Sequence, residues 1–452
     1  MNFSGISFIF YFLPALLILY YLLPKKYQNL LLIIFSSFFY IYADIKFFPL
    51  LIITGVINYL LSKKLKSKKN LIFGIILNIL PLFYFKYLDF LFDIINNIAS
   101  TNIEPLNLIL PLGISFTTFR MISFLVDVHS GKIKNPKFKE VMLYTLLFTY
   151  QVQGPIIRFS DIKEELTERT LTNNDLEDGS KRFIIGLAKK VILADTLSLF
   201  ITAISSEVTV ISTWLTATLN ILRLYLDFSA YSDMAIGISL LLGFHFKENF
   251  NYPFLNASMS DFWRNWHISL TSWFKDYIYI PLGGNRKGTI RTILNILIVW
   301  LLTGLWHGAN YTFIIWGVYF GIILILEKFI FQSFVSKHKI ISAIATNILV
   351  IIGFVFFYAG DLNEAIITLK NMLGLSNIPL INTETCFYLK NYLFVFIISI
   401  AASLKVSKLF KNKFTNLSII YYIILLILST AYIVDSSFNP FLYFRFWGQY
   451  EK

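Results

Sequence analysis

The chain has 452 residues and a formal net charge of +13, yet only 14% of its residues are charged and 56% are hydrophobic. Soluble domains carry about 25% charged residues, so this composition excludes a soluble globular protein and indicates an integral membrane protein. The single cysteine, Cys386, excludes an internal disulfide and a cysteine-based metal cluster. The basic residues cluster between apolar runs, which is typical of membrane topology signals and does not require a nucleic-acid partner.

Apolar runs recur along the chain, beginning with FIFYFLPALLILYYLL before Lys25. This first run lacks a basic flank and a small-residue cleavage site, so it predicts a retained span and not a signal peptide. Basic clusters follow the first span at Lys25 and Lys26 and the third span at 62–69, whereas the loop after the second span is nearly neutral. Because cytoplasmic loops are rich in Lys and Arg, we expect the N-terminus outside the cytoplasm.

The later segments predict an all-α polytopic protein of the bacterial cytoplasmic membrane. We expect about 11 transmembrane helices plus re-entrant and interfacial helices, because several apolar segments differ from the length of about 20 residues that a span needs. No composition shift or internal repeat divides the chain, so 1–452 is interpreted as a single domain with C-terminal helices in 339–450. The basic connector 405–414 is expected in the cytoplasm.

The otherwise apolar segment 223–254 contains Asp227, Ser229, Ser232 and Asp233. Acids within a span are costly unless they are paired or hydrated. We therefore expect hydrogen bonds that brace neighbouring helices, with a catalytic role as the alternative.

An aromatic stripe follows in the stretch 258–288. Apolar side chains recur there every three or four residues and predict one amphipathic helix: Phe262, Trp266, Leu270, Trp273 and Tyr277. Its tryptophans and charges suit a helix at the level of the lipid headgroups. His267 lies beside the stripe, and both a functional role and a plain surface helix remain open. In the following PLGGNRKG, Arg286 and Lys287 either meet an anionic group such as a phosphate or stand in a plain loop.

The longest apolar run contains one titratable imidazole. The 35 residues between Arg291 and Glu327 carry no charged side chain apart from His307 in LLTGLWHGAN. A straight helix over this run would be about 52 Å long, against a hydrocarbon core of about 30 Å, so we expect a break at Gly308 and Asn310. Irregular backbone at membrane depth is buried or lines a wet cavity, and ionisable residues there mark functional paths. We therefore predict a functional His307, with a neutral packing imidazole as the alternative.

Six motifs follow one another along the chain. They are LPLGISFTTF (110–119), QGPIIRFSD (153–161), GLAKKVILAD (186–195), YLDFSAYSDMAIG (225–237), DFWRNWHISLTSWFKDYIYIPLGGNR (261–286) and LLTGLWHGANYTFIIWG (301–317). In this order they resemble the membrane-bound O-acyltransferase family, and more narrowly the membrane subunits that O-acetylate bacterial polysaccharides such as alginate and peptidoglycan. The core of this resemblance spans 105–330, and it resumes in NPFLYFRFW (439–447).

The resemblance implies many helices around a central tunnel, with His307 and His267 at the family's two histidines. It also implies an acetyl group carried from acetyl-CoA toward an extracytoplasmic polysaccharide, with a separate SGNH-hydrolase-like acetyltransferase as partner. Departures at Asn265, Lys275 and Ala230, and the missing Pro in FTYQVQGP, concern substrate details.

Acyl transfer from a thioester to an alcohol needs a base, which histidine supplies near neutral pH. The chain has no G-x-S-x-G elbow, and Cys386 has no recognisable nucleophile setting. We therefore predict direct transfer with His307 as general base, His267 assisting from the cytoplasmic side, and no metal. The expected donor and substrate-binding residues are Arg264, Trp266, Trp306, Asn310, Arg286 and Lys287.

Other functions remain open beside this one. D-alanyl transfer to teichoic acid is the alternative within the family, although PLGGNR favours the polysaccharide branch. A secondary transporter would also be polytopic, but it would be expected to show inverted repeats. A non-catalytic scaffold gives no reason for a histidine at a buried break.

Overall fold

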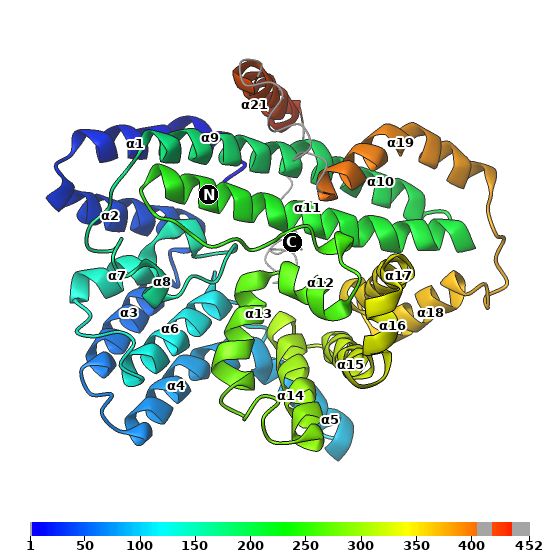
Figure 1. Cartoon of the computed structure of the whole chain (residues 1–452), viewed down its shortest axis with the longest axis horizontal. Coiled ribbons are helices and arrows are strands. Elements are labelled where there is room, and N and C mark those ends of the chain that lie inside the picture. The colour runs from blue at the N-terminus through cyan, green and yellow to red at the C-terminus, as the bar shows by residue number, and fades with distance from the viewer. Residues whose placement is uncertain (1, 405–417, 436–452) are drawn as a thin grey trace. The chain divides into compact units, whose positions relative to one another are not determined.

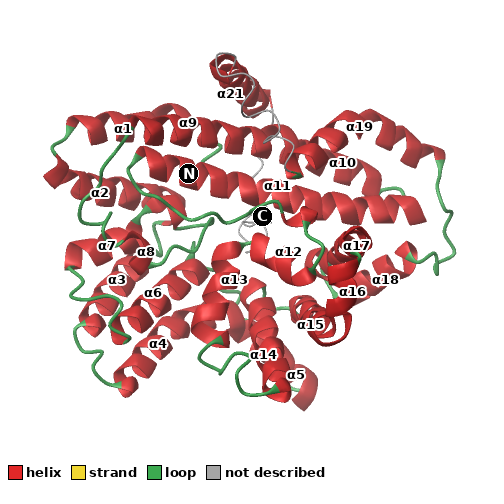
Figure 2. Cartoon of the chain, viewed as in Figure 1, coloured by secondary structure: helices red, strands yellow, loops and turns green. Residues whose placement is uncertain are grey.

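The computed structural model of the chain describes residues 2–404 and 418–435. Every regular element in those two ranges is a helix (Figure 2), which confirms the expected helical class. The connector 405–414 and the motif 439–447 lie outside the described residues. Of the expected C-terminal helices, the structure describes α17 (Lys339–Tyr358), α18 (Leu362–Met372), α19 (Thr383–Ser403) and α21 (Ser418–Asp435).

Five helical stretches are long and apolar enough to cross a membrane, and three apolar helices are shorter. The long ones are Lys68–Ala99, Thr289–His307, Tyr311–Lys337, Lys339–Tyr358 and Thr383–Ser403, and the short ones are Phe8–Leu22, Phe48–Ser62 and Ile419–Asp435. Helix length thus supports a membrane protein, and the total of about 11 crossings stays a prediction.

The described chain packs into two compact units, the first formed chiefly by residues 1–187 and 231–248. Its helices precede α11 (Val210–Leu241), which runs through both units (Figure 1). They are η1 (Phe8–Phe12), α1 (Leu13–Leu22), α2 (Lys25–Asp44), α3 (Phe48–Ser62), α4 (Lys68–Leu82), η2 (Phe83–Tyr87), α5 (Leu88–Ala99), α6 (Ile114–His129), α7 (Phe138–Leu146), η3 (Phe148–Tyr150), α8 (Phe159–Ile162) and α9 (Asn173–Ala188).

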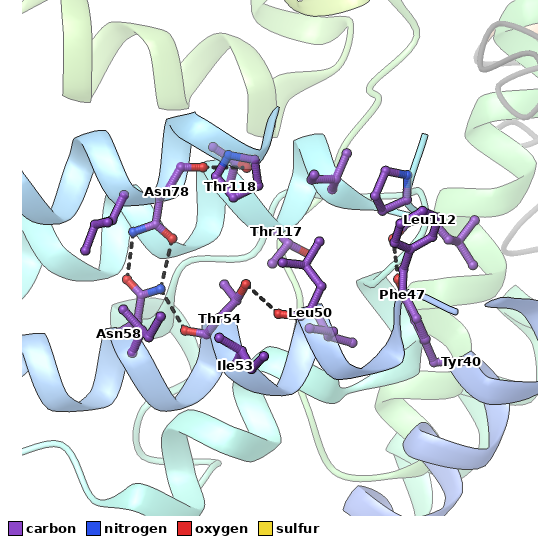
Figure 3. A pocket seen from close by; sticks show the side chains of 16 residues that line it. Tyr40, Phe47, Leu50, Ile53, Thr54, Asn58, Asn78, Leu112, Thr117 and Thr118 are labelled. Atoms are coloured by element: carbon purple, nitrogen blue, oxygen red, sulfur yellow. Dashed lines mark hydrogen bonds between the residues drawn. The ribbon is translucent and has the colours of Figure 1, made fainter. Parts of the chain in front are cut away.

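A pair of buried amides joins α3 to α4 in this first unit (Figure 3). Asn58 and Asn78 donate to each other's side-chain oxygen, with both N···O distances 2.9 Å. Each amide also donates to a carbonyl one turn earlier in its own helix, at Thr54 and Gly74. They border a small cavity of about 90 Å³. Because an unpaired amide is costly in apolar surroundings, this reciprocal pair fixes the register of the two helices.

Replacing Asn58 with Ala is expected to lower the free energy of unfolding by about 1–2 kcal/mol, because it leaves the Asn78 amide buried with one partner fewer. The double change Asn58→Leu and Asn78→Leu removes both polar groups and should recover part of that loss. Thermal unfolding in detergent micelles measures both effects. Equal stability of wild type and the single variant would contradict a structural role for the pair.

The second unit comprises residues 188–230 and 249–432. Besides α17, α18, α19, most of α21 and the first part of α11, it contains short helices and one long helical hairpin. These are η4 (Lys189–Ala194), α10 (Asp195–Ser205), η5 (Pro253–Leu255), α12 (Met259–Asn265), α13 (Ile268–Phe274), η6 (Lys275–Tyr279), α14 (Thr289–His307), α15 (Tyr311–Leu326), η7 (Glu327–Phe331) and α16 (Gln332–Lys337).

The helices α14 and α15 form a closely packed hairpin. The helical run is interrupted between them at the place that the sequence predicts. Asn310 caps α15, since its side-chain oxygen accepts from the backbone N–H of Thr312 at 3.0 Å. Small residues permit the close approach of the two helices. A Cβ atom at Gly304 would lie 2.3 Å from the carbonyl oxygen of Phe313, and one at Gly317 equally close to that of Trp300.

The prediction of a single amphipathic helix over the aromatic stripe was wrong, because the helix is interrupted at His267. The N–H of Trp266 closes α12 onto Phe262, and His267 then adopts a left-handed φ of 45° before α13 begins. Backbone pairing with a distant segment causes this break. The N–H of Ile268 donates to the carbonyl of Asn249 at 2.8 Å, so the 249–251 segment takes up a group that could not also continue the helix.

Candidate active site

His307 ends α14 inside a group of aromatic rings. Its ring centroid lies 4.9 Å from that of Trp306, 5.0 Å from Trp316 and 5.2 Å from Phe357. The imidazole is half-buried, and it stands at the junction where the helix stops. The rings thus fix the position of a titratable group at the break in the apolar run.

His267 is buried, with 2% of its surface exposed, in the turn between α12 and α13. Its Nδ1 lies 3.1 Å from the side-chain oxygen of Asn249, which also accepts from the hydroxyl of Ser269 at 2.8 Å. Its Nε2 is buried and has no hydrogen-bond partner among the described residues. Burial lowers the pKa of His267 to about 3, so the imidazole is neutral at physiological pH.

One tryptophan contacts both predicted histidines. The ring centroid of Trp306 lies 6.1 Å from that of His267 and 4.9 Å from that of His307. Phe228 of α11 also packs edge-on against His267 at 4.7 Å. The second unit therefore gathers the two histidines, far apart in the sequence, around a single indole ring.

The three predicted phosphate-binding residues, Arg264, Arg286 and Lys287, line one cavity of about 1210 Å³ in the second unit. Three further lysines and two carboxylates share its lining: Lys275, Lys328, Lys339, Asp261 and Glu327. Six basic side chains against two acidic ones give the lining an excess of positive charge. A cavity of this size and sign suits an anionic ligand.

Both carboxylates of the cavity already have partners. Asp261 accepts from Arg264 at 2.8 Å. Glu327 accepts from the N–H and the hydroxyl of Ser260, at the first turn of α12. The acidic groups of the lining are thus held by the protein itself, which leaves the excess of basic groups to an incoming anion.

A chain of aromatic ring contacts links the cavity lining to His307. Trp263 and Trp300 belong to its lining, with ring centroids 4.7 Å apart. The ring of Trp263 lies 5.6 Å from Trp316, which in turn lies 5.0 Å from His307. An indole therefore separates the cavity lining from the imidazole.

The remaining predicted residues make contacts within the protein. Trp266 is buried and packs against Tyr225 and Phe250. Asn310, besides capping α15, donates to the carbonyl of Gly360 at 3.1 Å. These two residues have structural partners, and their binding roles stay predictions.

Two acids of α11, the buried Asp227 and the partly buried Asp233, have basic partners. In the second unit, Asp227 lies 2.9 Å from the ammonium of Lys190, which is also 2.8 Å from Asp195. In the first unit, Asp233 accepts from Arg182 at 3.0 Å. Ser232 between them is also buried. Pairing offsets the cost of removing these carboxylates from water. Neither acid is among the side chains described above as packing against His307 or His267.

The sequence interpretation missed two groups of polar residues. Asn249 and Ser269 hold His267, and their only sequence signal is a polar side chain on each side of the histidine motif. Gln151 and Gln153 are fully buried, and both amide atoms of each lack a hydrogen-bond partner among the described residues. Their signal was two amides within a stretch otherwise typical of a core.

Comparison with known proteins identifies the family. Residues 125–359 match the MBOAT, membrane-bound O-acyltransferase family. Over 382 residues the chain is 40% identical to the probable alginate O-acetylase AlgI of Pseudomonas syringae pv. tomato, covering 81% of this chain and 74% of the relative. It is 35% identical over 387 residues to the peptidoglycan O-acetyltransferase of Helicobacter pylori, covering 76% and 73%.

A more distant relative is named for the transfer of a different acyl group, D-alanyl. The chain is 29% identical over 308 residues to the teichoic acid D-alanyltransferase of Bacillus subtilis, covering 64% of this chain and 75% of the relative. The chain belongs to the membrane-bound O-acyltransferase family, so the resemblance inferred from its motifs is confirmed. It is an O-acyltransferase of a bacterial membrane, and the transporter and scaffold alternatives fall with this assignment.

Proposed function

We propose that this protein takes an acetyl group from acetyl-CoA and passes it to an acceptor hydroxyl on the way to a cell-wall polysaccharide or exopolysaccharide, with His307 as the general base. The observation that carries this proposal is the basic cavity whose aromatic end leads to His307 through Trp316. The names of the relatives, two of which concern acetyl transfer to alginate or peptidoglycan, support the acetyl group and the class of acceptor.

The shape of acetyl-CoA fits the two ends of α14. The donor is elongated, with phosphates at one end and the thioester at the other. Arg286 and Lys287 precede α14, whereas His307 ends it. This helix of 19 residues rises about 27 Å from Thr289 to His307. Phosphates held by the basic turn would leave the pantetheine arm to run along the helix toward the imidazole.

The proposed reaction is a direct transfer. The neutral imidazole of His307 takes the proton of the acceptor hydroxyl. At the same time the hydroxyl oxygen attacks the carbonyl carbon of the thioester. The bond between the carbonyl carbon and sulfur then breaks, the ester is released, and the thiolate of coenzyme A recovers the proton from the imidazolium. His267 assists as a neutral hydrogen-bond acceptor beside the same indole ring. No covalent intermediate forms on Cys386.

The topology of the reaction follows from the same assignment. We infer that the basic turn at Arg286 and Lys287 faces the cytoplasm, where acetyl-CoA is made, and that the N-terminus lies outside. A tunnel through the helices would bring the acetyl group to the outer side. There a separate acetyltransferase partner, of the SGNH-hydrolase type, would complete the transfer onto the polymer.

D-alanyl transfer to teichoic acid is the second candidate, favoured by the Bacillus relative. Mild base releases both acyl groups from the envelope of the host, and each can then be quantified. In a strain lacking this protein, we expect base-released acetate from envelope polymers to fall to background while D-alanine is unchanged. Loss of D-alanine with acetate retained would move the protein to the second candidate, and loss of neither would contradict both.

A further inference from the structure

The backbone around His267 holds an unusual conformation. Its φ of 45° lies in the left-handed region, which residues other than glycine rarely adopt. Such outliers persist where the surrounding structure determines them, and they gather at functional sites. Here the backbone bond from Ile268 to the carbonyl of Asn249 fixes the turn. The same Asn249 therefore holds both the main chain after His267 and its imidazole.

The hydrogen bonds around Asn249 determine which nitrogen of His267 carries the proton. Its side-chain oxygen lies 3.3 Å from the backbone N–H of Ser269, which can only donate, so this atom is an acceptor. The Nδ1 of His267 at 3.1 Å must then be the donor. In a neutral imidazole the proton on Nδ1 leaves the lone pair on Nε2. That nitrogen is the one without a hydrogen-bond partner among the described residues.

We propose that Asn249 is a positioning residue that keeps His267 neutral and in the Nδ1–H tautomer, so that Nε2 accepts a hydrogen bond from a hydroxyl group at the active site. This role rests on the proposed acyl transfer at His307, which shares the Trp306 ring with His267. An amide oxygen is suited to the task because it accepts a proton-bearing nitrogen without adding the charge that would attract a second proton. Ser269 supports it by donating to the same oxygen at 2.8 Å.

The surroundings of His267 favour the neutral form. The rings packed against it come from α11, from the segment before η5 and from α14, and they are Phe228, Phe250 and Trp306. None of these rings carries a charge. The titratable groups next in sequence to these rings are Asp227, Glu248, Tyr252 and His307. Asp227 is paired with Lys190 and Glu248 with Arg182.

Another histidine of this chain shows the effect of a carboxylate in the same position. His245, in the first unit, lies 2.9 Å from an oxygen of Glu165 and 3.0 Å from one of Asp175. Partial burial lowers its pKa, but the hydrogen bonds and charges of these carboxylates outweigh burial and raise the pKa of His245 above its usual value. An aspartate in place of Asn249 should act on His267 in the same direction.

The variant Asn249→Asp tests the proposal, because it keeps the size of the side chain and changes its charge. Acetyl transfer from labelled acetyl-CoA is measured in host membrane vesicles, which carry the acceptor and any partner, between about pH 5 and pH 9. Protonated His267 cannot accept a hydrogen bond, so transfer should fall about 10-fold or more at the acid end, the effect of losing one hydrogen bond. It should recover as the pH rises above the new pKa. The matched control Asn251→Asp alters an exposed amide that bonds Asn265, and it should keep the wild-type profile.

Nitrogen NMR of protein with ¹⁵N-labelled histidine, in micelles, tests the same proposal independently of enzyme activity. It reports which imidazole nitrogens carry a proton. The chain has 5 histidines, and loss of one signal in His267→Gln assigns the residue. Wild type should show Nδ1 protonated and Nε2 unprotonated throughout the range, and Asn249→Asp should show a second protonation. A wild-type Nε2 that carries the proton, or a titration unchanged by Asn249→Asp, would overturn the proposal. Vesicles without any acetyl transfer would instead overturn the proposed function and leave the NMR result to stand alone.

Discussion

Replacing His307 with Ala is expected to reduce acyl transfer by about 100- to 10,000-fold, the range that a general base contributes. The imidazole stands at a break in an apolar run, held by Trp306, Trp316 and Phe357, and the proposed mechanism routes the proton of the acceptor through it. The measurement is transfer of labelled acetyl from acetyl-CoA in host membrane vesicles. At saturating donor, the loss should appear in kcat, because the basic cavity proposed to bind the phosphates is unchanged.

Two further variants separate chemistry from folding. His307→Gln keeps a polar side chain of similar size against the three rings but cannot accept and return a proton, so it should be as inactive as His307→Ala. His338→Ala removes an exposed imidazole between α16 and α17 and should retain full activity. Variant levels in the membrane are compared by quantitative immunoblot. Wild-type transfer by well-expressed His307→Gln would remove the histidine from the mechanism.

The break beside His307 could be predicted because a simple length limit enforces it. Thirty-five uncharged residues cannot form one straight helix inside a bilayer, and Gly308 with Asn310 offers a place to end the helix near the middle of that run. α14 accordingly ends at His307 and α15 starts at Tyr311. Local signals and a global constraint agree here, so the sequence was sufficient.

The break at His267 could not be predicted, because its cause lies elsewhere in the chain. The aromatic spacing of 262–277 favours a continuous helix, and nothing within that stretch opposes it. The backbone of Asn249 intervenes through a hydrogen bond to Ile268. Periodicity measures only which face of a helix is apolar. It carries no information on a distant segment that pairs with the backbone.

The basic cavity shows a similar limit. The sequence singled out Arg264, Arg286 and Lys287, which stand near the histidine motif. Lys328 and Lys339 were not chosen, because they are remote from the histidine motif in the sequence. Lys328 lies in η7 and Lys339 begins α17, and both line the same cavity. Basic residues can be counted from a sequence. Which of them line the same cavity depends on how the helices pack, and the sequence alone does not give that packing.

Reversing two charges in the basic turn is expected to weaken donor binding strongly. In the double variant Arg286→Glu and Lys287→Glu, the KM for acetyl-CoA should rise about 100-fold or more, because hydrogen bonds to charged groups contribute about 1.5–3 kcal/mol each. The changed residues precede α14 and the reacting thioester is proposed at its far end, so kcat should change little. The measurement is the initial rate of acetyl transfer as a function of acetyl-CoA concentration. It is made in inside-out membrane vesicles, whose cytoplasmic face is exposed to the added acetyl-CoA.

A matched double variant, Lys337→Glu and Lys370→Glu, changes net charge equally at exposed residues outside the cavity lining and should leave KM near that of wild type. Added salt offers a second comparison, because screening weakens attraction between a basic cavity and phosphates. KM of wild type should rise with salt, whereas that of the Arg286 and Lys287 variant should stay flat or fall. If kcat fell while KM held, the basic turn would lie at the reacting end, and acetyl-CoA would have to enter with its thioester toward Arg286 and not toward His307.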